Sequence, residues 1–324
     1  MADDGRKEVD FLLQQMETEI KNIYKQAYQE TWKKAQKYML DFRQEDIKKR
    51  QWVQSGKWTN QQYKDWRRSK LLTGKRWFDM STALAKDFTH SNEIALSIIN
   101  GHMPEVYAMG HNWGAYETEI LHGLSAQISF TLYDRHTVER LIRTKNISLL
   151  PEFPPEKVLD IPKSMRWNKQ QINSAVLQGI LQGDSIDHIA DRLQSVSDMN
   201  RNVAIRNART MTTSAENGGR MSSYIQAKEQ GIELEKEWIA TLDSRTRDTH
   251  RDVDGEIVPT HKTFSNGCRY PGDPRGDPAE TYNCRCCLGS VLPKYKVKSN
   301  KENLTIDGMS YAEWKKEKPV YKKR

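Results

Sequence analysis

The residues best suited to chemistry lie in the C-terminal third of this 324-residue chain. All four cysteines fall between residues 268 and 287, namely Cys268, Cys284, Cys286 and Cys287. Thiolate and imidazole groups are the ligands that zinc prefers, and a closed zinc site needs four of them. Thiols so close together do not form the spread disulfide framework of a secreted protein. Three interpretations stay open: a zinc site, reduced thiols packed in a core, and a redox-sensitive disulfide.

A dense group of charged residues precedes the cysteines. Residues 243–255 read D-S-R-T-R-D-T-H-R-D-V-D-G. These side chains can form a network of paired charges that holds together a small domain with few apolar residues. They could also form a nuclease site, with His250 as general base and an aspartate as metal ligand. The structural interpretation is favoured, because the segment has no carboxylate cluster of defined spacing.

Short motifs around this segment follow a fixed order. A predicted strand begins at Trp238 and a second follows the Asp-Gly turn at 254–255; Phe264, N-G, P-G-D-P and N-C-R-C come after them. This ordered set resembles the C-terminal module of the phage Mu F-like minor head proteins, the phage head morphogenesis family. The resemblance runs from Trp238 to about Pro293, and the preceding helices extend it back to about residue 165. Its structural motif comprises Trp238, Asp243, Arg245, Arg247, His250, Asp254, Gly255 and Asn283.

The resemblance implies a non-enzymatic minor head protein of a tailed phage or prophage. Such a protein acts in capsid assembly inside the procapsid, in the host cytoplasm during assembly and later in the virion head interior. It implies the portal protein, capsid or scaffold proteins and packaged phage DNA as partners. The alternative is a toxin-linked enzyme of the nuclease or ADP-ribosyltransferase type carrying the same module. The 31 residues after Pro293 are expected to be too few for such an effector domain.

The resemblance also bears on a metal. Some relatives carry C-x-x-C in place of R-x-x-H and a histidine just before N-C-R-C, a set that suggests structural zinc. Here His250, Cys284 and Cys286 match that set, whereas Arg247 and Thr281 stand where the other ligands would be. The remaining candidates to complete four ligands are Cys268, Cys287 and His261. Otherwise no cofactor is expected.

Basic charge is concentrated in two segments. Residues 33–76 carry 14 Lys/Arg against 4 Asp/Glu, and residues 294–324 carry 10 against 4, within a chain of net charge +8. Lysine and arginine neutralise phosphates without regard to sequence, and aromatic rings can stack on bases or anchor a protein interface. Non-specific DNA and a protein groove are both expected partners. The candidate binding residues are Lys33, Lys34, Lys48, Lys49, Arg50, Trp52, Trp58, Trp66, Arg67 and Arg68.

Helical periodicity dominates the rest of the chain. An apolar stripe from Leu12 to Met39 predicts a first helix of about 35 to 40 residues, too long for a compact small domain to cover, so an extended hairpin or an arm on a partner is expected. Further helices are predicted at 168–182, from Ile186, and at about 201–229. A helix-turn-helix reader of DNA is disfavoured there, because the helix from Ile186 is acidic. No stretch is apolar enough for a membrane span or a signal peptide, and no membrane partner is expected.

The predicted fold class is therefore α+β, with mainly helical N-terminal and middle regions and a small mixed, loop-rich C-terminal module. Prolines at 151–162 indicate a linker. The expected organisation is an extended helical region at 1–150, a linker at 151–165, a helical lead-in at 166–232, the Mu F-like module at 233–293 and a basic tail at 294–324.

Overall fold

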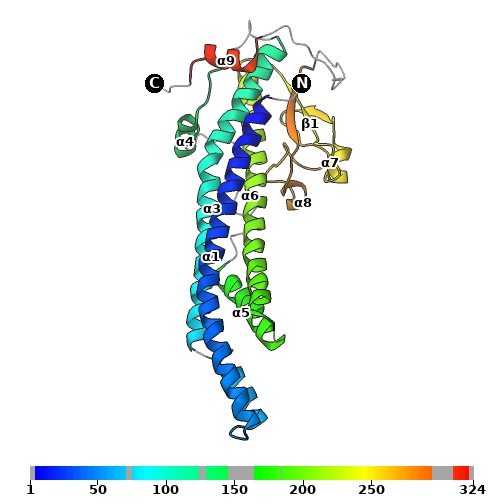
Figure 1. Cartoon of the computed structure of the whole chain (residues 1–324). Coiled ribbons are helices and arrows are strands. Elements are labelled where there is room, and N and C mark those ends of the chain that lie inside the picture. Colours follow the sequence, from blue (N-terminus) through cyan, green and yellow to red (C-terminus); the bar gives the residue numbers. More distant parts are fainter. Residues whose placement is uncertain are drawn as a thin grey trace. The chain divides into compact units, whose positions relative to one another are not determined.

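The computed structural model describes residues 4–70, 75–123, 129–144, 164–182, 184–293 and 309–320. It is mainly helical and has one small three-stranded antiparallel sheet near its C-terminal end, which confirms the predicted α+β class (Figure 1). The predicted linker lies almost wholly outside the described residues, as do Gly183 and most of the basic tail. No helix among the described residues is long and apolar enough to cross a membrane.

Ten helices and three strands follow one another along the described chain. The longer helices are α1 (Asp4–Gln54), α2 (Asn60–Arg68), α3 (Lys75–Tyr116), α4 (Arg135–Arg143), α5 (Met165–Gln182), α6 (Ile186–Glu229) and α9 (Tyr311–Glu317). The shorter ones are the π-helix η2 (Glu117–Leu121), α7 (Asp248–Asp252) and α8 (Pro278–Thr281). The strands are β1 (Glu235–Ile239), β2 (Ile257–Pro259) and β3 (Cys287–Val291).

The chain divides into two compact units, each built from separated segments. Unit 1 comprises residues 1–17, 98–159 and 205–324, and unit 2 comprises residues 18–97 and 160–204. Helices α1, α3 and α6 each contribute residues to both units.

Unit 2 is a helical bundle whose core accounts for much of the apolar stripe of α1. Ala27, Ala35 and Met39 are buried against residues of α3, α5 and α6, among them Phe88 and Ile172. The expectation that an outside partner covers this stripe is therefore wrong for the described part of the chain. Helix α1 is also longer than expected, at 51 residues.

Helix α6 is continuous where the sequence suggested two helices. It runs from Ile186 to Glu229, so the expected break before Arg201 is absent. The Ser185 hydroxyl accepts a hydrogen bond from the backbone N–H of His188 at its start. At its end Gly231 adopts φ +88°, a left-handed conformation that glycine tolerates.

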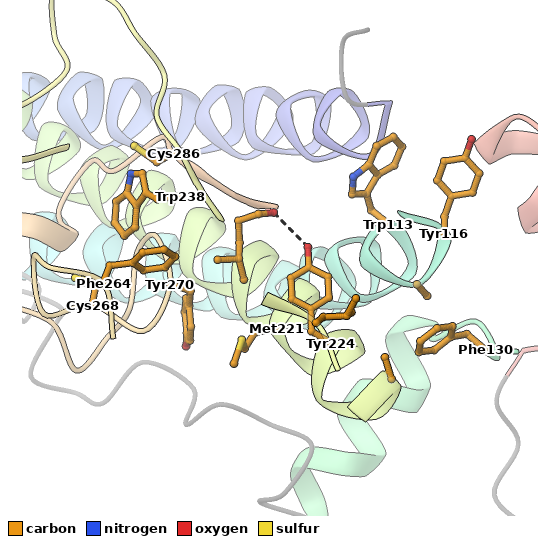
Figure 2. Close-up of a cluster of buried hydrophobic side chains, with 14 of the residues drawn as sticks. Trp113, Tyr116, Phe130, Met221, Tyr224, Trp238, Phe264, Cys268, Tyr270 and Cys286 are labelled. Carbon is orange, nitrogen blue, oxygen red and sulfur yellow. Dashed lines mark hydrogen bonds between the residues drawn. The ribbon is translucent and has the colours of Figure 1, made fainter. Parts of the chain in front are cut away.

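Unit 1 packs the small sheet against the C-terminal part of α6. The strand order is β2-β1-β3, and both pairs are antiparallel. Figure 2 shows the buried side chains that join these elements, including Trp238 of β1, Phe264 and Tyr270 of the following loops, and Tyr224 of α6.

A short C-terminal segment completes the unit 1 core. Trp314 of α9 is buried against the ring of Tyr116, and its indole N–H donates to Glu119 at 2.8 Å. The Lys318 ammonium lies 2.5 Å from the same carboxylate. Leu132 forms a parallel bridge with Val320 beyond the helix.

Candidate functional site

The charged loop after β1 is held by its own backbone and by a second loop. The Asp243 carboxylate accepts hydrogen bonds from the Arg245 backbone N–H at 2.8 Å and from the Arg285 guanidinium at 2.6 and 2.7 Å. Arg285 lies in the N-C-R-C motif, so this pair joins the two motifs. These hydrogen bonds hold the pKa of the Asp243 carboxyl well below its usual range.

The turn after α7 is fixed in the same way. The Asp254 carboxylate accepts from the backbone N–H of Ala240 at 2.8 Å, and the Gly255 N–H donates to the carbonyl of Trp238 at 2.8 Å. Gly255 has φ +77°, which explains why a glycine stands there. Both residues of this Asp-Gly pair therefore hold the end of β1 in place.

His250 lies at the centre of a buried cluster of metal-binding side chains. Its Nδ1 is 3.4 Å from the Cys286 sulfur and 3.9 Å from the Cys284 sulfur, and all three donor atoms lie within 4.8 Å of one another. With zinc–sulfur and zinc–nitrogen bonds at tetrahedral angles, a nitrogen and a sulfur ligand of one ion are separated by about 3.6 Å. The observed triangle therefore fits three ligands of one zinc ion.

The other side of the imidazole faces a carboxylate. Nε2 of His250 lies 3.1 Å from Glu280 Oε2, although the contact lacks the alignment of a good hydrogen bond. A carboxylate in this position favours a proton on Nε2, which leaves the Nδ1 lone pair directed at the sulfurs. The aromatic ring of Trp238 packs edge to face on the imidazole at 5.2 Å between ring centroids and fixes its plane.

The two thiols differ in acidity. Hydrogen bonding with Cys284, supported by His250, lowers the pKa of Cys286. The pKa of Cys284 is raised by the same hydrogen bond and by its burial. Cys286 is therefore the more acidic thiol, and a bound cation would favour deprotonation of both.

None of the expected additional ligands joins the triangle. Cys268 is buried in the hydrophobic core, Cys287 lies on β3 and His261 is exposed. Arg247 uses its guanidinium to donate to the carbonyl of Tyr282, and the Thr281 hydroxyl donates to backbone carbonyls of the 273–277 loop. Among the described residues, the protein therefore offers three ligands.

A pocket opens beside the three ligands. It is lined by Thr241, Arg245, Thr246, Arg247, His250, Asn283, Cys284, Arg285 and Cys286. The N-C-R-C motif (283–286) and the D-S-R-T-R motif (243–247) thus both contribute residues to the lining of one pocket.

Polar residues of α6 support the ligand loop, and sequence analysis missed them. The Thr213 hydroxyl donates to the carbonyl of Cys284 at 2.6 Å, and the Thr210 hydroxyl accepts from the backbone N–H of Asn283 at 3.0 Å. The Asn217 amide accepts from the Leu288 N–H and donates to the carbonyl of Cys286. Residues 210, 213 and 217 are spaced three and four apart, so a polar stripe on this helix was the available signal. Glu280 gave no comparable signal.

The candidate basic residues are divided between two places. Lys33 and Lys34 lie midway along α1, where Lys34 pairs with Asp87 at 2.6 Å. The others surround the turn between α1 and α2, which we call the basic hairpin end (residues 42–68). The nearly buried Asp46 holds it together: its carboxylate contacts the Arg50 and Arg67 guanidinium groups and accepts a hydrogen bond from Tyr63.

The tryptophans of the basic hairpin end contact other side chains of the same chain. The Lys49 ammonium lies 3.4 Å from the ring centroid of Trp52 and 4.4 Å from that of Trp58. Trp66 stacks on Phe42 with ring centroids 5.7 Å apart. These rings therefore contribute to the packing of the hairpin, whose residues 42–68 carry an excess of basic over acidic side chains.

The nuclease arrangement finds little support in this geometry. His250 faces two sulfurs and Glu280, whereas Asp243 and Asp254 are each occupied by hydrogen bonds to other groups. In the part of the chain that the structure describes, the cluster that could hold a metal consists of His250, Cys284 and Cys286.

Comparisons with known proteins find a family similar to residues 170–289. Residues 170–289 match the family described as Phage Mu protein F like protein. The chain is 27% identical over 237 residues to minor head protein GP7 of Bacillus phage SPP1, which covers 69% of this chain and 72% of that protein. It is 25% identical over 179 residues to the uncharacterized protein YqbB of Bacillus subtilis, covering 49% of this chain and 57% of that protein.

One similar protein carries an enzyme name. The chain is 30% identical over 150 residues to NAD(+)–arginine ADP-ribosyltransferase EFV of Enterococcus faecalis, but the match covers 45% of this chain and only 31% of that protein. No solved structure matches the chain significantly. The matched region 170–289 contains the three-ligand triangle, its pocket and the polar stripe of α6, so these features lie in the part of the chain that is similar to the Phage Mu protein F like family.

Proposed function

We propose that this chain is a minor head protein that acts in head morphogenesis of a tailed phage or prophage. The similarity to the SPP1 minor head protein supports this proposal most directly. That match covers 69% of the chain, whereas the family model matches only residues 170–289. We assign it no enzymatic activity. The transferase-named relative is similar over less than a third of its own length, so its name carries little weight for this chain.

We place the protein in the head interior, in contact with the portal and with capsid or scaffold proteins, after assembly in the host cytoplasm. Co-expression with the portal protein, followed by affinity purification and quantitative mass spectrometry of purified heads, tests this placement. Recovery with the portal and in heads is expected. Absence from both would remove the proposal.

We also propose that the basic hairpin end binds packaged DNA through its phosphates. Lys48, Lys57, Lys64 and Arg68 are exposed there, whereas the rings of Trp52 and Trp66 already contact Lys49 and Phe42 of the same chain. Binding without sequence preference and with a steep salt dependence is expected, because phosphate contacts release counterions.

Charge removal tests the DNA proposal better than deletion of residues 33–76, because that deletion would remove the buried Ala35 and Met39. Changing Lys48, Lys57, Lys64 and Arg68 together to Gln should weaken duplex binding at low salt by at least tenfold. The matched control changes four exposed lysines elsewhere to Gln: Lys25, Lys86, Lys228 and Lys262. Equal losses of DNA affinity in both variants would mean that net charge alone causes the binding. Unchanged DNA binding in the first variant would mean that this surface binds a protein partner instead.

We further propose that His250, Cys284 and Cys286 hold a zinc ion that stabilises the C-terminal module. The fit of the donor triangle and the carboxylate behind His250 support this assignment. Bound zinc would cross-link α7 to the N-C-R-C loop. Elemental analysis of purified protein should find about one zinc per chain in the parent and none in Cys286→Ser.

A further inference from the structure

The three protein ligands do not complete a tetrahedral site. A structural zinc ion normally takes four protein ligands, whereas a site that keeps one position for an exchangeable ligand has three. All the histidines and cysteines lie among the described residues, and in that part of the chain no fourth histidine, cysteine, aspartate or glutamate joins His250, Cys284 and Cys286. We therefore look for the fourth ligand among small molecules.

The pocket shows where that ligand would enter. The three donor residues are buried, but they line it together with Arg245, Arg247 and other polar residues, so this is the side from which an outside ligand would approach. The opposite approach is blocked, because the Trp238 ring packs on the imidazole and α6 supports the loop through Thr213.

The charge around the pocket selects the kind of ligand. A divalent cation bound by two thiolates and a neutral imidazole has no net charge. Arg285 is neutralised by Asp243, but Arg247 donates to a backbone carbonyl, and Arg245 is largely exposed with its guanidinium 3.8 Å from the same Asp243. Arg245, Arg247 and Arg285 therefore exceed the two nearby carboxylates, Asp243 and Glu280 behind His250, by one positive charge, which favours an anionic fourth ligand over a neutral one.

We infer that the His250, Cys284 and Cys286 site is an exchangeable metal site whose fourth ligand is a small anion bound from the arginine-lined pocket. This inference rests on the metal site proposed above. Arg247 is a positioning residue here: its charge attracts the anion while the metal forms the bond. No covalent bond within the protein changes.

The test uses the full chain, stripped of metal and reloaded with one equivalent of Co²⁺, whose visible spectrum reports coordination. Thiolate-to-cobalt charge transfer should appear, and titration with azide should shift the visible bands in a saturable manner. Arg247→Gln should weaken azide binding by about tenfold, the size expected for removing one nearby charge. The control Lys262→Gln, an exposed lysine outside the pocket, should titrate like the parent.

The outcomes distinguish the proposed metal site from the proposed exchangeable fourth ligand. If Co²⁺ binds with charge transfer but the spectrum ignores azide, the site is closed and the inference is wrong while the metal site stands. If the parent binds no Co²⁺, both are wrong. Because Arg247→Gln could lose the hydrogen bond to Tyr282 and misfold, the azide titration of the parent decides the question without it.

Discussion

The Arg285 guanidinium and the Asp243 carboxylate meet through two parallel hydrogen bonds, 2.6 and 2.7 Å long. The pair connects two loops that are separated by some forty residues in the sequence and form the walls of one pocket. Arg285 is therefore as much a part of the module's framework as the aspartate that the sequence singled out.

Changing Asp243 to Ala should lower the melting temperature of the protein. The loss should be smaller than for a fully buried pair, because the Asp243 and Arg285 side chains are 36% and 27% exposed and water screens their attraction. Thermal melting should show this decrease, and the exposed Asp252→Ala should melt like the parent. A parent-like melt for Asp243→Ala would mean that the loops are held by other contacts.

The same pair predicts a pH dependence at acidic pH. Hydrogen bonding to Arg285 depresses the pKa of Asp243, so its stabilising contribution is complete above the ordinary aspartate pKa of about 4 and is lost as the pH falls through the lower folded-state value. When the free energy of unfolding of Asp243→Asn is measured with urea at successive pH values, this acidic decrease should be missing. A pH profile identical to that of the parent would contradict the prediction.

His111 predicts a second pH effect. Its ring stacks on Tyr133 with centroids 3.7 Å apart, neither ring nitrogen has a hydrogen-bond partner among the described residues, and burial lowers its pKa to about 3. The unfolded chain takes up a proton near pH 6.5 and the folded chain does not, so the free energy of unfolding should fall as the pH drops from about 6.5 towards 3.

Changing His111 to Phe should flatten that decrease. It should also stabilise the protein by about 1 kcal/mol or more at neutral pH, because two unsatisfied nitrogens are removed while the stacking is kept. Urea unfolding at several pH values measures both effects. The exposed His261→Gln is the control and should keep the parent profile; a parent-like slope in His111→Phe would assign the effect to other groups.

Two glycines of α3 should respond in opposite ways to alanine. A Cβ at Gly110 would lie 2.0 Å from the backbone carbonyl oxygen of Glu216 on α6, whereas a Cβ at Gly101 meets nothing within 4 Å. Gly110→Ala should therefore cost about 3 kcal/mol or more by forcing the helices apart, and Gly101→Ala should gain roughly 0.5 to 1 kcal/mol from helix propensity. Chemical unfolding measures the stability of both variants. A Gly110→Ala variant as stable as the parent would contradict the prediction and show that the two helices separate at little cost.

The segment around α9 should detach when its tryptophan is removed. Trp314 is buried and donates to Glu119, so Trp314→Ala removes the main anchor and leaves part of that buried carboxylate unsatisfied. Hydrogen exchange of the 311–317 amides should accelerate strongly while α6 stays protected. Lys316→Ala, an exposed change in the same helix, should leave both unchanged. Uniform acceleration throughout unit 1 would instead mean that the segment is integral to the core.

Local patterns predicted the fold class and many of its elements. The helical periodicity of α5 and the strand-turn-strand pattern at β1 and β2 depend on residues adjacent in sequence, and the structure has both. The resemblance to the phage Mu F-like proteins is confirmed for residues 170–289. The prediction that an outside partner covers the apolar stripe of α1 was wrong, because helices distant in the sequence cover it.

The candidate site was predictable as residue types but not as geometry. The resemblance singled out His250, Cys284 and Cys286, the three residues that the structure brings together, but it left Cys268, Cys287 and His261 open as further ligands because their distance from the imidazole depends on the fold. Glu280 and Asn217 were missed because a single carboxylate or amide acquires meaning only from its neighbours in space. Likewise, the tryptophans of the basic hairpin end looked available for bases until their ring contacts were known.

The division of the chain into interleaved segments constrains its order of folding during synthesis. Unit 2 ends at residue 204, so all of its segments have been made while much of unit 1 is still to be translated. Residues 4–17 must then wait for partners from 205 onward, such as Glu216, which pairs with Arg6. At about 10 residues per second, the roughly 200 residues between Arg6 and Glu216 take about 20 seconds to synthesise, a window in which the N-terminal turns of α1 lack these later partners and a ribosome-associated chaperone could bind them.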